Sequence, residues 1–161
     1  MKQVRSWPVR PMRLEDIPAV MEIDRVSFPI PWSERTYRFE ITENPSSHLL
    51  VTTAEPESVT SAIVGFSGYW LVVDEAHIST FAVHPGWRRQ GIGQALLREV
   101  LRQAVLQGAT SATLEVRVSN LAAQQLYANH GFVPVGRRRG YYRDNNEDAL
   151  LMTTYSLKPP A

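Results

Sequence analysis

The 161-residue sequence contains no cysteine. This absence excludes a disulfide framework, a cysteine-ligated zinc site, an iron–sulfur cluster and a cysteine nucleophile. The four histidines are scattered along the chain and lack the spacing of a zinc site, so we expect no metal.

Long apolar runs and an excess of charge are also missing. The densest apolar stretch, residues 69–73, is far shorter than the ~20 residues that a membrane span needs. Residues 1–8 lack the apolar core of a secretory signal, so we expect a cytoplasmic protein without membrane contact. The net charge of +1 provides no overall field for nucleic acid, and we expect no direct nucleic-acid binding.

Lysine is scarce, since only Lys2 and Lys158 are found among the 17 cationic residues. Compositional bias explains the predominance of arginine, and the alternative is that guanidinium groups are used to bind anionic ligands. The length and the 43% hydrophobic content predict one globular domain covering residues 1–161.

Hydrophobic periodicity and turn residues predict an α+β fold in which a mixed sheet of about seven strands is flanked by about four helices. Two prolines make residues 28–32 irregular, and a turn is expected at residues 55–58. The predicted strands are residues 9–12, 48–54, 61–73, 75–83, 112–118, 132–135 and 149–155, and the predicted helices are residues 14–27, 33–44, 91–107 and 121–130.

The most informative stretch joins the strand ending at Val83 to the helix beginning at Gly91. A helix N-terminus presents unpaired N–H groups and a partial positive charge, which together bind phosphate oxygens. Gly91 and Gly93 leave room for a ligand, and Arg88 and Arg89 add forked donors. The stretch matches neither a Walker loop nor a dinucleotide fingerprint. Its alternative interpretation is a tight turn with solvated arginines.

The pattern Arg88-x-x-Gly91-x-Gly93 resembles the acetyl-CoA pyrophosphate motif of the GNAT N-acetyltransferase superfamily. Further blocks in the same order resemble its RimI-type branch, the ribosomal-protein alanine N-acetyltransferases. The resemblance extends from residue 10 to residue 155. Its blocks are residues 28–32, 78–83, 114–120, 122–123, 126–127, 131–132, 137–142 and 147–152.

The resemblance implies that acetyl-CoA is the co-substrate and that a defined set of residues binds it. Backbone amides of the strand before the motif hold the pantetheine, the motif surrounds the pyrophosphate, and Asn120 contributes its side-chain amide. For Asn120 a plain helix cap is the alternative role, and both roles are compatible. The implied binding residues are Phe81, Ala82, Val83, Arg88, Arg89, Gln90, Gly91, Ile92, Gly93, Gln94, Asn120 and Tyr127.

Amide formation from an amine and a thioester needs a general base and a general acid. Glu115 alternates with apolar neighbours on a predicted strand, and the resemblance implies that it is the base, acting through a water. Its alternative role is a salt bridge to Arg117 or Arg143. Tyr127 is implied as the acid that protonates the leaving sulfur, and its alternative role is that of a half-buried aromatic residue.

The resemblance implies that the acceptor is a protein N-terminus, namely the N-terminal alanine of small-subunit ribosomal protein eighteen or a broader set of Ala and Ser N-termini. Phe28, Trp32, Tyr141 and Tyr142 flank the implied acceptor site, where Ile30-Pro31 is additional to the expected Phe-Pro-Trp-Ser. Alternative functions are a GNAT enzyme acting on lysine or on a small amine, and a non-catalytic CoA- or ribosome-binding module supported by the basic run 137–139. That run is also typical of a solvated strand edge.

Overall fold

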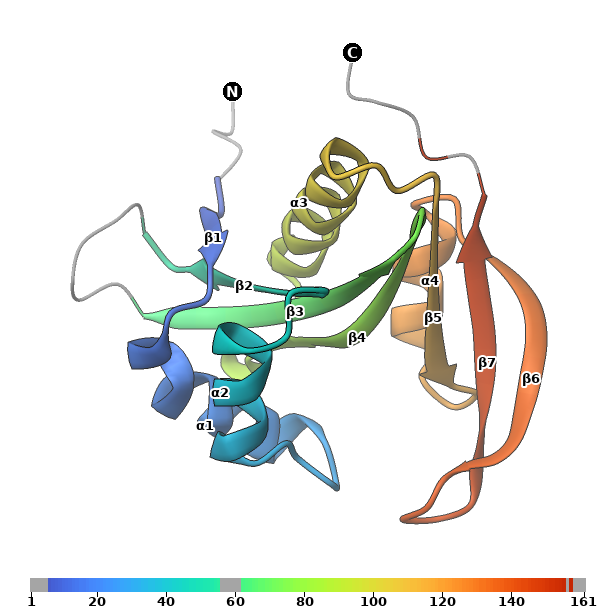
Figure 1. The fold of residues 1–161 in the computed structure, drawn as a ribbon. Helices are drawn as coiled ribbons and strands as arrows, with labels where there is room; N and C mark the ends of the chain where they lie inside the picture. Colours follow the sequence, from blue (N-terminus) through green and yellow to red (C-terminus); the bar gives the residue numbers. More distant parts are fainter. Residues whose placement is uncertain (1–5, 56–61, 156, 158–161) are drawn as a thin grey trace, which may run out of the picture. The chain divides into compact units, whose positions relative to one another are not determined.

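A computed structural model describes residues 6–55, 62–155 and 157. In these residues a seven-stranded mixed sheet has the order β1-β2-β3-β4-β5-β7-β6 (Figure 1). β4 and β5 are parallel, whereas the pairs β1–β2, β5–β7 and β6–β7 are antiparallel. The strands are β1 (Val9–Pro11), β2 (Ser47–Thr53), β3 (Ile63–Val72), β4 (Glu75–Val83), β5 (Ser111–Arg117), β6 (Val133–Tyr142) and β7 (Glu147–Thr154).

Four α-helices accompany the sheet in the described residues, which confirms the predicted α+β class. They are α1 (Ile17–Ser27), α2 (Glu34–Thr42), α3 (Ile92–Leu106) and α4 (Leu121–Ala128), with one-turn 3₁₀ helices at Leu14–Asp16 and Pro85–Trp87. None of the described helices has both the length and the apolar character needed to cross a membrane. The predicted turn at residues 55–58 lies, apart from Glu55, outside the described residues.

Most predicted elements differ from the structure by one or two residues at an end, and two differ by more. The first helix was expected from residue 14, but α1 begins at Ile17, because Pro18 lacks an N–H group and favours the first turn of a helix. The strand expected at 132–135 continues as β6 to Tyr142. Nearly all of β6 is exposed, since it pairs only with β7 at the edge of the sheet, so it lacks the apolar alternation that reveals a strand. The arginine run 137–139 is thus part of an exposed edge strand.

The chain divides into two compact units. One contains the described residues 6–55, 62–68 and 80–100, and the other contains residues 69–79, 101–155 and 157. In the first unit α1 and α2 pack on a buried cluster that includes Ile23, Val51 and Phe66. A second cluster of that unit joins Trp7 and Val64 to Ile92 at the start of α3.

The core of the second unit forms between β5, β7 and α4. Alternate residues of β5, Ala112, Leu114 and Val116, are buried, and the residues between them are partly exposed. This alternation places Glu115 on the face opposite the apolar side chains, as the sequence predicts. Tyr127 of α4 packs against Phe132, with ring centroids 5.8 Å apart.

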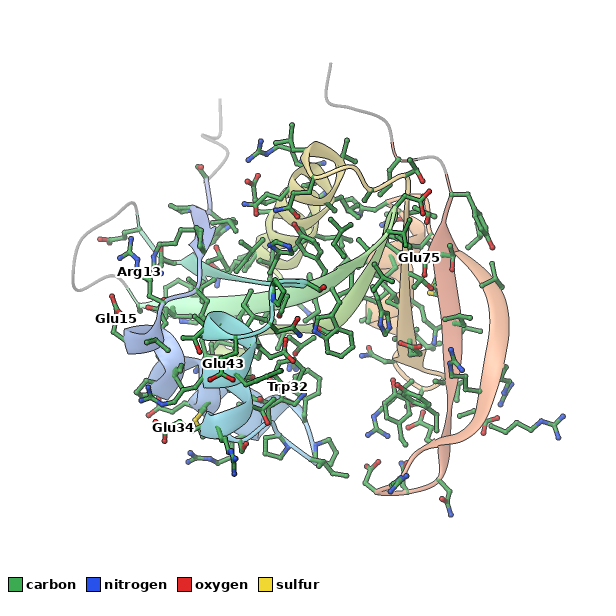
Figure 2. All side chains as sticks on the ribbon, viewed as in Figure 1. Arg13, Glu15, Trp32, Glu34, Glu43 and Glu75 are labelled. Atoms are coloured by element: carbon green, nitrogen blue, oxygen red, sulfur yellow. The ribbon has the colours of Figure 1, made fainter. Side chains whose placement is uncertain are left out.

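A buried carboxylate ties the irregular segment 28–32 to the helices of the first unit. Asp24 is 2% exposed and accepts hydrogen bonds from the Tyr37 hydroxyl and, at 3.2 Å, from the Trp32 amide. The Phe28 amide donates to the Asp24 carbonyl, 2.9 Å away, and Trp32 packs on the Tyr37 ring beside α2 (Figure 2). Burial raises the pKa of Asp24, and the hydrogen bonds from the Tyr37 hydroxyl and the Trp32 amide oppose that effect.

We expect Tyr37→Phe to lower the free energy of unfolding by about 1–3 kcal/mol, because the buried Asp24 carboxylate loses a donor that water cannot replace. Urea denaturation followed by circular dichroism measures this change. As a control, Tyr155→Phe removes a hydroxyl from a residue that is 65% exposed. This variant should leave the midpoint of the urea unfolding transition unchanged. An unchanged midpoint for Tyr37→Phe would show that the Asp24–Tyr37 contact does not stabilise the fold.

Candidate functional site

The loop between β4 and α3 has an unusual backbone. A 3₁₀ turn at Pro85–Trp87 follows β4, and the His84 side chain accepts the Gly86 amide at its start, 2.9 Å away. Arg89 and Gly91 then take positive φ values of 63° and 82°. A left-handed conformation is costly for arginine, and such strain is often found at ligand sites.

The start of α3 leaves backbone donors exposed to a ligand. The Ala95 amide donates a hydrogen bond to the Gly91 carbonyl, 3.1 Å away, which is the first helical hydrogen bond that reaches back to the loop. The N–H groups of Ile92, Gly93 and Gln94 precede that bond and point out of the N-terminal end of the helix. A Cβ built on Gly91 would meet nothing within 4 Å, so the approach to this turn is open.

Two arginines of the loop lie next to these donors. Arg88 and Arg89 are exposed, and neither forms an ion pair with any residue that the structure describes. The Trp7 indole N–H donates to the Gln90 carbonyl at 3.0 Å, and Trp7 and Trp87 pack edge to face, 6.0 Å apart. The N-terminal segment therefore holds the loop, and its cations remain available for an anion.

The strand that leads into this loop carries the residues expected to hold the pantetheine. Pairing of β4 with β5 covers Glu75, Ala76 and His77. Residues 81–83 lie farther along β4, beyond the residues that pair with β5. Ala82 is buried, and the other two residues are half-buried.

Glu115 lies in the second unit with two charged or polar partners. Its Oε2 is 2.7 Å from His77 Nε2 and its Oε1 is 3.4 Å from Arg138 Nε. Only 11% of the Glu115 side chain is exposed. The hydrogen bond with His77 holds the pKa of Glu115 below its ordinary value, with help from Arg138 and against the effect of burial. Glu115 is therefore an ionised carboxylate.

An open depression of about 430 Å³ exposes this carboxylate. Its charged and imidazole lining groups are Glu75, His77, Glu115 and Arg138, with Glu75 at the start of β4 (Figure 2). The alternative partners of Glu115 considered from the sequence, Arg117 and Arg143, are wrong: the cation beside Glu115 is Arg138. Arg117 instead contacts Asp144 at 2.9 Å and Glu147 at 3.2 Å.

Two tyrosines of the same unit, Tyr141 and Tyr142, interact electrostatically with Glu115, and a third, Tyr127, interacts with Tyr142. Burial raises the pKa of Tyr127 well above its ordinary value, and Tyr142 adds to the rise. Burial also raises the pKa of Tyr142 to about 12, and Glu115 contributes to that rise and to the raised pKa of Tyr141. Tyr142 is held under the Arg117 guanidinium, 4.0 Å from its ring centroid. The expectation of a half-buried Tyr127 is wrong, since the residue is 6% exposed.

The remaining predicted residues have structural roles that the structure makes plain. Asn120 caps α4, accepting the Ala123 amide at 3.2 Å, and is itself exposed. Phe28 and Trp32 are half-buried against the cluster under α1 and α2. They lie in the first unit, whereas Tyr141 and Tyr142 belong to the second.

His77 and Arg138 are the two residues of the Glu115 site that sequence reasoning missed. The histidines were set aside because no spacing joined them, and 38 positions separate His77 from Glu115. The only sequence signal is that His77 and Glu115 both lie on predicted strands. Their contact depends on the register of β4 with β5, which pairs His77 with Thr113.

Comparisons with known proteins agree on one family. The model of the acetyltransferase (GNAT) family matches residues 17–132. A protein of Escherichia coli (strain K12), the [ribosomal protein bS18]-alanine N-acetyltransferase, is 34% identical over 139 residues, which cover 85% of this chain and 89% of that protein. A Bacillus subtilis (strain 168) protein, provisionally named for the same activity, is 42% identical over 144 residues, covering 89% of this chain and 92% of the relative.

A solved structure supports the same relationship. The crystal structure of the ribosomal-protein-S18-alanine N-acetyltransferase from Escherichia coli superposes with a TM-score of 0.79 at 30% identity. The superposition covers 97% of each chain. The similarity therefore includes both compact units.

The backbone strain at Arg89 can be tested by substitution. We expect Arg89→Gly to raise the free energy of unfolding by about 0.5–1 kcal/mol, because glycine adopts a positive φ without a steric cost. Arg89→Ala keeps the cost and should leave stability unchanged, so it controls for loss of the guanidinium. Chemical denaturation of both variants measures the difference, and equal stability of the two would contradict the assignment of strain to Arg89.

Proposed function

This chain belongs to the acetyltransferase (GNAT) family, and on that premise we propose that it transfers the acetyl group of acetyl-CoA to the N-terminal α-amine of a protein. The proposed acceptor is the N-terminal alanine of ribosomal protein bS18, because that is the substrate in the name of the Escherichia coli relative. A ribosomal acceptor would place the reaction in the cytoplasm. The observation that carries the proposal is a largely buried carboxylate, Glu115, that lines an open depression in a chain of this family.

The loop before α3 is proposed to bind the pyrophosphate of acetyl-CoA. Its N–H groups and the open approach at Gly91 suit an anion, and the exposed guanidinium groups of Arg88 and Arg89 supply charge. The amides of Phe81 and Val83 suit the pantetheine, whose amide groups extend a strand-like ladder. Asn120 would add its side-chain amide while capping α4.

Glu115 is proposed as the general base. The attacking amine has to lose protons, and a carboxylate that lines an open depression can take one through a water. Its lowered pKa keeps Glu115 in the basic form throughout the physiological range. An α-ammonium group, with a pKa of about 7.7–8.0, needs less help than a lysine ammonium near about 10.4.

Tyr127 is proposed as the general acid. Its raised pKa keeps the phenol protonated at physiological pH, so the hydroxyl can donate its hydrogen to the sulfur as the thiolate departs. Burial against Phe132 fixes the ring, so the hydroxyl has little freedom to point elsewhere. Tyr141 and Tyr142 are proposed as acceptor-binding residues on the side of Glu115, and Phe28 and Trp32 as the acceptor-binding residues of the first unit.

Two other functions remain as outcomes of experiment. A GNAT enzyme acting on lysine or on a small amine would use the same loop and the same carboxylate. A CoA- or ribosome-binding module without turnover would explain the exposed arginines 137–139 of β6, but it gives no role to a carboxylate held against His77.

The acceptor is tested with acetyl-CoA and two versions of one peptide that begins with alanine and contains an internal lysine. We expect acetylation of the version with an unblocked α-amine, located by mass spectrometry on the first residue, and none of the version with a blocked α-amine. A peptide beginning with serine should also react. Acetyl groups found mainly on lysine would favour the lysine alternative, and acetyl-CoA binding without transfer would favour the binding module.

Replacement of Tyr127 by Phe should lower kcat by about 10²–10⁴-fold, the usual contribution of one acid–base group. Affinity for acetyl-CoA, measured by calorimetry, should stay the same, because the ring and its packing are kept. A loss confined to KM would assign the hydroxyl to binding. Unchanged kinetics would leave Tyr127 with a packing role alone.

A further inference from the structure

His77 contacts Glu115 and has no role in the reaction proposed above. Parallel pairing sets His77 of β4 opposite Thr113 of β5, and Glu115 follows two residues later on the same face of β5. The resulting contact between His77 Nε2 and Glu115 Oε2 is 2.7 Å long. Both side chains belong to the second unit and line the same depression.

The direction of this hydrogen bond follows from the charge of Glu115. An ionised carboxylate only accepts hydrogen bonds, so Nε2 has to carry the proton that it donates. The imidazole ring is held from the side by Trp70, with ring centroids 5.5 Å apart and planes at 61°. His77 is thus a fixed donor, with 29% of its side chain exposed.

The two oxygens of Glu115 differ in what surrounds them. Oε2 is engaged by His77, whereas Oε1 has Arg138 Nε at 3.4 Å, beyond the usual length of an N–H···O hydrogen bond. The Arg138 side chain is 53% exposed on the edge strand β6. Hydration and side-chain freedom weaken such a contact, so Oε1 is the oxygen that an amine or a water can reach.

We propose that His77 is a positioning residue, which holds Oε2 of Glu115 so that Oε1 faces the acceptor amine. This inference rests on the proposed function. Without the donor, the carboxylate can rotate about its terminal bond and turn towards Arg138, which would pair with both oxygens. The carboxylate conformer in which Oε1 faces the amine is then only a minor one. As a result kcat falls, while acetyl-CoA binding is unaffected.

Single substitutions of His77 separate donation from shape. His77→Ala should lower kcat about ten- to a hundredfold, the usual value of a hydrogen bond to a charged group, with an unchanged KM for acetyl-CoA. In His77→Gln the amide nitrogen is the same number of bonds from Cβ as Nε2, so activity should stay within about threefold of the wild type. The shorter His77→Asn should behave like alanine.

A matched control is available in the same unit. His130 is also half-buried and contacts the Leu126 carbonyl through Nδ1, at 2.9 Å. His130→Gln makes the same chemical change away from Glu115 and should leave kcat unchanged. Thermal melting of all variants shows whether each is folded.

A double-mutant cycle with Glu115→Gln decides whether His77 acts through the carboxylate. If it does, His77→Ala should cost less than about twofold in the Glu115→Gln background, because the group that it positions is already absent. The same loss in both backgrounds would overturn the proposal, and so would a glutamine variant as slow as the alanine variant. A wild-type protein that acetylates no α-amine would instead overturn the proposed function.

Discussion

The site depends on one constraint, which is the cost of placing a charged carboxylate within a buried strand. Glu115 stays ionised at 11% exposure because His77 donates to one oxygen and Arg138 lies near the other. Those partners come from β4 and β6, and β7 lies between β5 and β6, so the charge is stable only when four strands are in register. The carboxylate held in this way also lines an open depression. Stability and the proposed chemistry therefore have the same structural requirement.

A second buried carboxylate, that of Asp24, shows how strongly the hydrogen-bonding partners of a buried acid affect its pKa. Asp24 accepts hydrogen bonds only from neutral donors among its assigned contacts, the Tyr37 hydroxyl and the Trp32 amide, and burial raises its pKa. Glu115 has an imidazole and a guanidinium as partners, and its pKa is lowered. Asp24 serves to fix the segment 28–32, whereas Glu115 is suited to accept a proton. Both residues are largely buried acids, so the difference in their pKa values follows from the neighbours.

The loop before α3 supplies the complementary half of the proposed reaction. It combines a helix N-terminus with a backbone that turns left-handed at Arg89 and Gly91. Glycine accepts this conformation without cost, but arginine does not, so Arg89 gives up stability at a position where a guanidinium can meet a phosphate. The tie from Trp7 to the Gln90 carbonyl helps to hold the strained turn. The proposed anion site is therefore held by a contact between residues that are far apart in the sequence.

The sequence by itself determined the order of elements, the α+β class and the loop at residues 88–94, because periodicity, caps and glycine positions are local properties. The family was predicted from the resemblance of ordered sequence blocks to a known family. The sequence also predicted the face on which Glu115 lies, since alternation along a strand is also local. Only the tertiary structure decided the partners of Glu115. His77 is 38 positions away, and its contact depends on the register between two parallel strands, which no local pattern specifies. The extent of β6 was likewise hidden, because an edge strand exposed on both faces has no burial to impose a pattern on its side chains.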